Sequence, residues 1–146
     1  MMSSLDDMLW AINPDNDSTE KMMLRLKEFI EGLKSKHNVQ AYLLVDKKAE
    51  QLNLNMKQRK EIFWLYRGGI ENVIKCGGDN CRLHITYEKP MLIYMLEFDI
   101  SNIDMQQLTN LRQRNELTEK LTKLKATFDV ETHKMSHLFI LKIPVQ

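Results

Sequence analysis

Cysteine and histidine have the widest chemical range among the side chains of this sequence. Cys76 and Cys81 enclose Gly-Gly-Asp-Asn, a spacing that suits either a metal site or a disulfide. A structural zinc ion needs four ligands, and the sequence offers no second pair of Cys or His at ligand spacing. We therefore predict two reduced thiols, one at a helix end and one in the following strand. Structural or surface roles are predicted for the four scattered histidines, His37, His84, His133 and His137.

Cys76 lies near the end of the strongest helical pattern in the chain, Asn55–Gly78. Asn55 is a favourable N-cap, and Gly77-Gly78 can adopt the positive φ that ends a helix. Gly68-Gly69 costs roughly 1 kcal/mol per glycine inside a helix, so something other than helix propensity must place this pair. Apolar residues recur at the spacing of one buried face, at Ile62, Phe63, Tyr66, Ile70, Val73 and Ile74. The solvent side is predicted to hold Lys57, Arg59, Lys60, Arg67, Glu71 and Lys75.

The segment YRGGIENVIK (Tyr66–Lys75) resembles the N-box helix of bacterial sensor histidine kinases, on the ATP-binding domain of the GHKL superfamily. By this resemblance Asn72 is the Mg²⁺-coordinating asparagine, and Lys75 is the lysine near the phosphates. Gly68 stands where the family has its catalytic glutamate, so no catalytic residue is assigned. Helical spacing places Gly68, Asn72 and Lys75 on one face. The resemblance thus implies Mg-ATP as cofactor, with part of its site lost.

The N-terminal run MMSSLDDMLWAINPDNDS is similar to the junction between the second dimerisation helix and the catalytic domain in a histidine kinase subfamily. Ser3–Ile12 carries a helical apolar stripe and ends at Asn13-Pro14, because a residue before proline avoids the α region. We expect the last turns of a helix that begins outside this chain. The predicted organisation is residues 1–14 as the end of the dimerisation helix and linker, and residues 15–146 as the ATP-binding-like domain.

Two scaffold elements are predicted between these motifs. Asp17 with Glu20 three residues later forms an acidic capping box that opens a helix over about Ser18–Lys36. Val39–Asp46 has the composition and length of a strand. The helix should bury Met22, Leu26, Phe29, Ile30 and Leu33, and expose Lys21, Arg25, Lys27 and Glu28.

A hairpin is predicted next, with strands Arg82–Glu88 and Met91–Ile100 around Lys89-Pro90. By the resemblance, Asp99 is the aspartate that binds the adenine amino group. The family follows this aspartate with glycines, whereas residues 100–104 read Ile-Ser-Asn-Ile-Asp. β-Branched isoleucine resists positive φ, so this loop should not wrap ATP in the family's way.

The C-terminal third resembles the scaffold of the family's ATP-binding domain. Gln107–Leu121 is predicted to be a helix and resembles the helix of the second glycine box, without its glycine and with almost no length left for an ATP lid. Lys123–Thr132 and His137–Pro144 are predicted strands. SHLFILKIP, which contains the second, resembles the strand that ends these domains.

Composition limits the classes of protein to consider. The chain has 146 residues, enough for one domain, and 21 basic against 20 acidic side chains. This balance provides no broad field for nucleic acid or an anionic membrane. No apolar run approaches the roughly 20 residues of a membrane span. We predict a cytoplasmic chain without nucleic-acid or membrane contacts of its own, and the resemblance leaves open an anchor in a full-length protein.

The predicted fold is an α/β two-layer sandwich: a mixed, mostly antiparallel sheet of about five strands with three helices on one face. Two functions stay open. One is the ATP-binding domain of a two-component sensor histidine kinase, an ATP:protein-histidine phosphotransferase, degenerate and with weak or no nucleotide binding. The other is a non-catalytic structural or regulatory module with the same fold. The resemblance implies an upstream dimerisation and phosphoacceptor domain and a response regulator as partners, and Ser3–Ile12 could form a homodimer.

Overall fold

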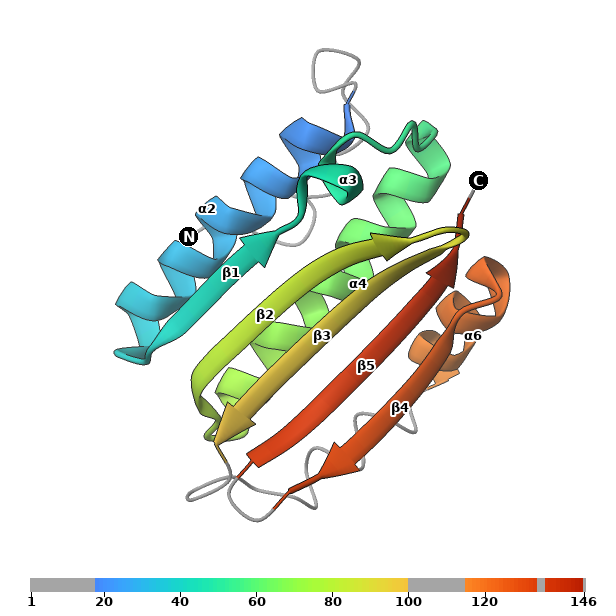
Figure 1. Cartoon of the computed structure of the whole chain (residues 1–146). Helices are drawn as coiled ribbons and strands as arrows, with labels where there is room; N and C mark the ends of the chain where they lie inside the picture. Colours follow the sequence, from blue (N-terminus) through green and yellow to red (C-terminus); the bar gives the residue numbers. More distant parts are fainter. Residues whose placement is uncertain (1–17, 100–114, 134–135, 146) are drawn as a thin grey trace.

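The computed structural model describes residues 18–99, 115–133 and 136–145. These form one five-stranded sheet with helices on one face (Figure 1). The strand order is β1-β2-β3-β5-β4, with β1 parallel to β2 and the other neighbours antiparallel. The predicted two-layer fold is confirmed. Its elements are α2 (Thr19–His37), β1 (Ala41–Val45), α3 (Lys47–Glu50), α4 (Met56–Lys75), β2 (Asp79–Glu88), β3 (Met91–Asp99), α6 (Asn115–Leu124), β4 (Thr127–Thr132) and β5 (Ser136–Pro144).

Helix α2 begins one residue later than predicted. Its N-cap is Ser18, whose side chain accepts a hydrogen bond from the Lys21 backbone N–H at 3.1 Å. Asn38 ends the helix in the left-handed conformation, with φ 52°. The predicted exposure of Arg25 is wrong: the residue is 8% exposed, and its guanidinium lies 3.3 Å from the Glu28 carboxylate. A long arginine stem can cover apolar surface while its charged end is paired.

Helix α4 confirms the helix predicted within Asn55–Gly78. Asn55 and Gln58 form a reciprocal capping box, with hydrogen bonds of 2.8 and 3.0 Å. The helix ends before Gly77, which has φ 99°. Arg59 was wrongly predicted on the solvent side: it is 6% exposed, and its Nη1 donates to the Leu54 carbonyl oxygen at 2.6 Å.

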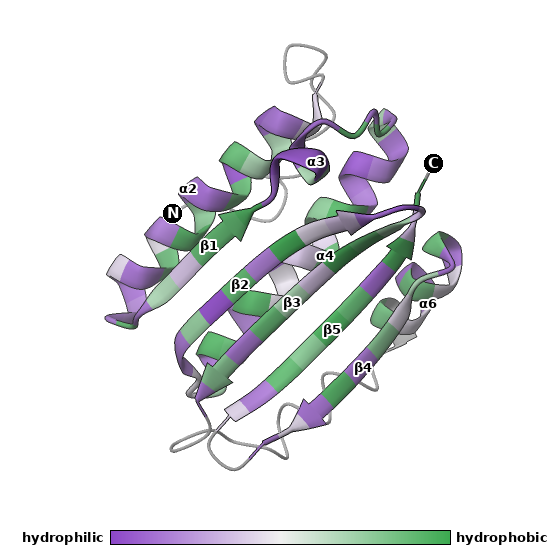
Figure 2. Cartoon of the chain, viewed as in Figure 1, coloured by the Kyte–Doolittle hydropathy of each residue, from purple (hydrophilic) through white to green (hydrophobic). Residues whose placement is uncertain are grey.

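The sheet buries its helix-facing side. Alternate residues of β2 and β3 point toward the helices and are almost fully buried: Cys81, Leu83, Ile85, Leu92, Tyr94, Leu96 and Phe98. The other face is not covered by a described helix and is turned toward the viewer in Figure 1. Figure 2 shows how apolar and polar residues alternate along these strands. The core therefore lies between the sheet and α2, α4 and α6.

Other boundaries differ from the predictions. The short helix α3 was not anticipated, and α6 runs to Leu124, so Lys123 does not begin a strand. Lys125, with φ 54°, ends α6, and Ala126 N–H donates to the Leu121 carbonyl oxygen at 2.8 Å. Residues 1–17 and 100–114, which include the predicted dimerisation segment and the Ile100–Asp104 loop, lie outside the described residues. No helix among the described residues is long and apolar enough to cross a membrane.

Candidate functional site

The predicted site residues of the N-box lie on the C-terminal half of α4. At 100° per residue, Gly68 and Asn72 fall on the same flank of the helix, and Lys75 lies close to it. A Cβ built on Gly68 would meet no described atom within 4 Å, so space is open beside it. Asn72 is partly exposed. The structure therefore places the Asn72 amide and the open space at Gly68 on the same flank of α4.

Lys75 extends this group toward the helix end. Its Nζ lies 3.2 Å from Glu71 Oε1, and the side chains of Lys75 and Glu71 are 53% and 22% exposed. An exposed pair of this kind contributes about 0.3–0.5 kcal/mol. Because this ion pair is weak, Lys75 could leave Glu71 and bind a more highly charged anion.

Asp99 lies on the face of the sheet opposite to α4. Its neighbour Phe98 is buried among the helix-facing residues, and successive side chains in a strand point to opposite faces. The Asp99 carboxylate accepts hydrogen bonds from Asn80 Nδ2 at 3.1 Å and from Arg82 Nη2 at 3.4 Å. Arg82 also binds Glu97 at 2.8 Å on the open face. Asp99 is thus held in an open-face charge network and is not grouped with Asn72 and Lys75.

The second glycine of the pair has a packing role. A Cβ on Gly69 would lie 2.9 Å from the hydroxyl oxygen of Tyr94, which donates to the Tyr66 carbonyl oxygen at 3.1 Å. The Tyr66 and Tyr94 rings stack with centroids 4.6 Å apart. Gly69 therefore lets α4 approach β3 closely enough for a buried tyrosine hydroxyl to bond its backbone. This explains half of the glycine pair, and Gly68 is not constrained in the same way.

Glu61 was missed by sequence reasoning, although it lies seven residues before Gly68 and so on the same flank. It is 5% exposed, and its carboxylate forms ion pairs with Lys120 and, at 3.8 Å, with Lys123. Burial raises the pKa of Glu61, but the hydrogen bond and charge of Lys120, with the charges of Lys123 and Lys60, outweigh it, so its pKa is lowered. Its pairing with α6 was not predictable, because it depends on where α6 docks.

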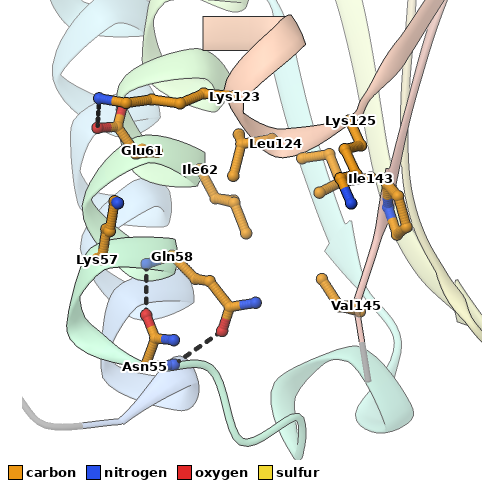
Figure 3. Close-up of a pocket in the computed structure, with 11 residues that line it drawn as sticks. Asn55, Lys57, Gln58, Glu61, Ile62, Lys123, Leu124, Lys125, Ile143 and Val145 are labelled. Carbon is orange, nitrogen blue, oxygen red and sulfur yellow. Dashed lines mark hydrogen bonds and ion pairs between the residues drawn. The ribbon is translucent and has the colours of Figure 1, made fainter.

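A cavity of about 240 Å³ lies at the N-terminal end of α4 (Figure 3). Ile62 and Leu124 point into it from α4 and α6, with Val145 on the opposite wall. The Asn55–Gln58 capping bonds and the Glu61–Lys123 ion pair border it. The cavity is at the opposite end of α4 from Asn72 and Lys75. It is therefore separate from the predicted nucleotide residues.

The thiols and histidines show no metal chemistry within the described part of the chain. Cys76 and Cys81 form no disulfide, as predicted, and both are buried. Burial together with the charge of Asp79 raises the pKa of Cys81 to about 12. Among residues 18–99, 115–133 and 136–145, no group of three or more His, Cys, Asp or Glu side chains could hold a metal ion. His84 instead pairs with Asp46 at 2.9 Å.

Mg-ATP, which the family resemblance implies, fits these residues only in part. Asn72 supplies an oxygen of the type that Mg²⁺ prefers, and Lys75 supplies a cation. The open space at Gly68 contains no carboxylate, and Asp99 already accepts two hydrogen bonds on the other side of the sheet. The described residues therefore offer only part of the chemistry that Mg-ATP requires.

Comparisons with known proteins identify the fold. No protein-family model and no curated protein matches the sequence. Among solved structures, the catalytic domain of histidine kinase ThkA superposes with a TM-score of 0.63 at 16% identity, over 85% of this chain and 90% of that one. Acinetobacter baumannii histidine kinase AdeS gives 0.66 at 13% identity, over 97% and 75%. The histidine kinase domain of the E. coli osmosensor EnvZ gives 0.59 at 12% identity, over 83% and 84%. The fold predicted from the sequence motifs is thus the fold of histidine kinase catalytic domains.

Proposed function

We propose that this chain is the ATP-binding domain of a two-component sensor histidine kinase in which nucleotide binding is weak or lost. The observation that carries the proposal is the exposed flank of α4, where Asn72 remains beside an open space at Gly68, within the fold of histidine kinase catalytic domains. The fold supplies the scaffold, and this flank supplies the residual chemistry.

Phosphoryl transfer depends on positioning and on neutralisation of phosphate charge. In this chain Asn72 would hold Mg²⁺ through its amide oxygen, and Lys75 would exchange Glu71 for a phosphate oxygen. Mg-ATP would bring the transferable phosphoryl group. Gly68 has no side chain to orient an attacking group, so the described residues support binding better than turnover.

A second function is favoured by the charge network around Asp99. Arg82 binds both Glu97 and Asp99, which fixes the predicted adenine-binding carboxylate by protein contacts alone. Contacts of this kind maintain a folded domain without any ligand. They favour a non-catalytic structural or regulatory module that interacts with a partner through the former nucleotide side.

The partners follow from the first function. ThkA has been crystallised in complex with the response regulator protein TrrA. By analogy, we propose that this domain works with a response regulator and with a dimerisation and phosphoacceptor domain. A cytoplasmic location is part of the same proposal.

Calorimetric titration with Mg-ATP tests the proposal, together with thermal unfolding with and without the nucleotide. We expect one cooperative transition without ligand, nearly unchanged by 1 mM Mg-ATP. A Kd of 10 µM would instead stabilise the fold by about 2.7 kcal/mol and raise Tm by roughly 5–10 °C. Such a rise would contradict weak binding.

The matched variants are Asn72→Ala on α4 and Lys89→Ala in the β2–β3 turn. Any residual heat of Mg-ATP binding should disappear in Asn72→Ala and persist in Lys89→Ala. Residual binding that survives Asn72→Ala would refute the role of this flank. No detectable binding by any of the three proteins would favour the non-catalytic module.

A further inference from the structure

The open face of the sheet has an apolar centre. Register pairs His84, Met95 and Ile140 in one row across β2, β3 and β5, with Leu44 of β1 beside His84. The flanking rows add Ile93 and Leu138. Ile93 is only 8% exposed, whereas Leu44, Met95, Leu138 and Ile140 are exposed or partly exposed. An open sheet face normally carries polar side chains, so these four apolar residues indicate an interaction surface.

A hollow of about 790 Å³ lies over the part of this face that is next to α3. Helix α3 lies at the upper end of the sheet in Figure 1. Ile93, Met95 and Ile140 contribute its apolar lining. The exposed lysines Lys47 and Lys48 of α3 and Lys142 of β5 stand around it, with Asp46 and Glu88 as the acidic members. Three lysines and two carboxylates therefore border the hollow, which gives its surroundings a small excess of positive charge.

We propose that the N-terminal segment of this same chain, Ser3–Ile12, docks on this hollow. The segment carries Leu5, Met8, Leu9 and Ile12 at helical spacing, with Trp10 among them. Residues 1–17 contain four aspartates and no lysine or arginine. Their charge complements Lys47, Lys48 and Lys142, and it disfavours the lower part of the face, where Glu97, Asp99, Asp129 and Glu131 lie.

Chain geometry permits this docking. Thr19 Oγ1 donates to the Leu52 carbonyl oxygen at 2.6 Å, which holds the start of α2 against the segment that follows α3. Lys47 and Lys48 of α3 line the hollow. The connection from Asn13 to Ser18 can span at most about 20 Å. A ten-residue helix is about 15 Å long, close to the roughly 14 Å between β1 and β5 across strands about 4.8 Å apart. The segment would therefore cover the apolar row without strain.

The proposal is independent of nucleotide binding and is tested on the full chain. The sequence has two tryptophans, so Trp64→Phe leaves Trp10 as the only one. We expect acrylamide to quench Trp10 several-fold less than a free indole, with no change between low and high protein concentration. Met95→Asp, in the hollow, should remove this protection. Leu24→Asp, at a 57% exposed position on α2, is the matched control and should leave it intact.

Charge reversal provides a second test that does not touch the apolar surface. Lys47→Glu with Lys48→Glu alters two exposed side chains and should make quenching of Trp10 at least two-fold faster, as should high salt. Trp10 that is as accessible as free indole in the Trp64→Phe protein would overturn the proposal. Protection that grows with protein concentration in parallel with a sedimenting dimer would also overturn it, since a second copy would then be the occupant. Protection that is unchanged by Met95→Asp in a folded protein would overturn it as well.

Discussion

At the N-terminal half of α4, Glu61 is 5% exposed and bound by two lysines of α6, whereas two turns later on the same flank Gly68 has open space beside it and Asn72 is partly exposed. In the first half, the Glu61 carboxylate forms ion pairs that hold α6 against α4. The second half also packs Tyr66, Ile70 and Val73 into the core. Its flank with Gly68 and Asn72, however, borders open space that a ligand could enter. A lowered pKa alone does not mark a functional residue, because structural ion pairs lower a pKa in the same way.

Removal of the Glu61 charge should give the largest effect on stability. Breaking a buried ion pair costs about 3–5 kcal/mol, and we expect Glu61→Gln to cost roughly 2–3 kcal/mol because Lys120 and Lys123 retain some access to water. Chemical denaturation measures the loss. Glu71→Gln, which breaks the exposed Glu71–Lys75 pair, is the control and should cost less than about 0.5 kcal/mol. Equal losses would abolish the distinction between the two halves.

The same variant predicts a pH dependence. The folded pKa of Glu61 is lowered, so its ionised form stabilises the protein above the pKa of the unfolded chain, and this stabilisation is lost as pH falls through the folded pKa. The difference in unfolding free energy between wild type and Glu61→Gln should therefore be greatest above about pH 5 and shrink toward acid. A difference that grows toward acid would mean that burial, not the lysines, controls Glu61.

The next effect separates the two glycines. Gly69→Ala places a Cβ against the Tyr94 hydroxyl and should destabilise the fold by about 1–3 kcal/mol through overpacking. Tyr94→Phe removes the hydroxyl and so should relieve most of this cost in the double variant, which a double-mutant cycle of unfolding free energies measures. Additive losses would show that the hydroxyl is not the obstacle.

The sequence predicted what local pattern encodes. The apolar stripe of α4, its Asn55 cap and the β2–β3 hairpin all follow from periodicity and turn residues, and the structure has them. Arg25 and Arg59 were assigned to solvent because charge usually means exposure, and tertiary packing buried both. The Ser18 cap lay one residue from the predicted Asp17, because both residue types can cap a helix and local pattern does not choose between them.

The candidate site was less predictable than the fold. Helical spacing correctly grouped Gly68 with Asn72, because both are on one element. Asp99 comes from a strand, and its orientation depends on which face Phe98 occupies in the core. Glu61 and Gly69 depend on α6 and Tyr94, partners 59 and 25 residues away along the chain (120 − 61 and 94 − 69). Residues whose role lies in a distant contact leave no local signal.

The smallest effect concerns Gly68, where the sign should be opposite to that at Gly69. Gly68→Ala adds a methyl group to open space and should stabilise the helix by about 0.5–1 kcal/mol, since alanine exceeds glycine in helix propensity by this amount. Gly68→Glu should stabilise slightly less, because Glu71 lies three residues on and like charges at this spacing repel by a few tenths of a kcal/mol. Denaturant midpoints at constant m-value measure both changes.

Phosphoryl transfer should stay absent in Gly68→Glu, because Asp99 is still held by Asn80 and Arg82. If Gly68→Glu instead destabilises by several kcal/mol while Gly68→Ala does not, the space beside Gly68 is closed to water, and a desolvated carboxylate is the cause.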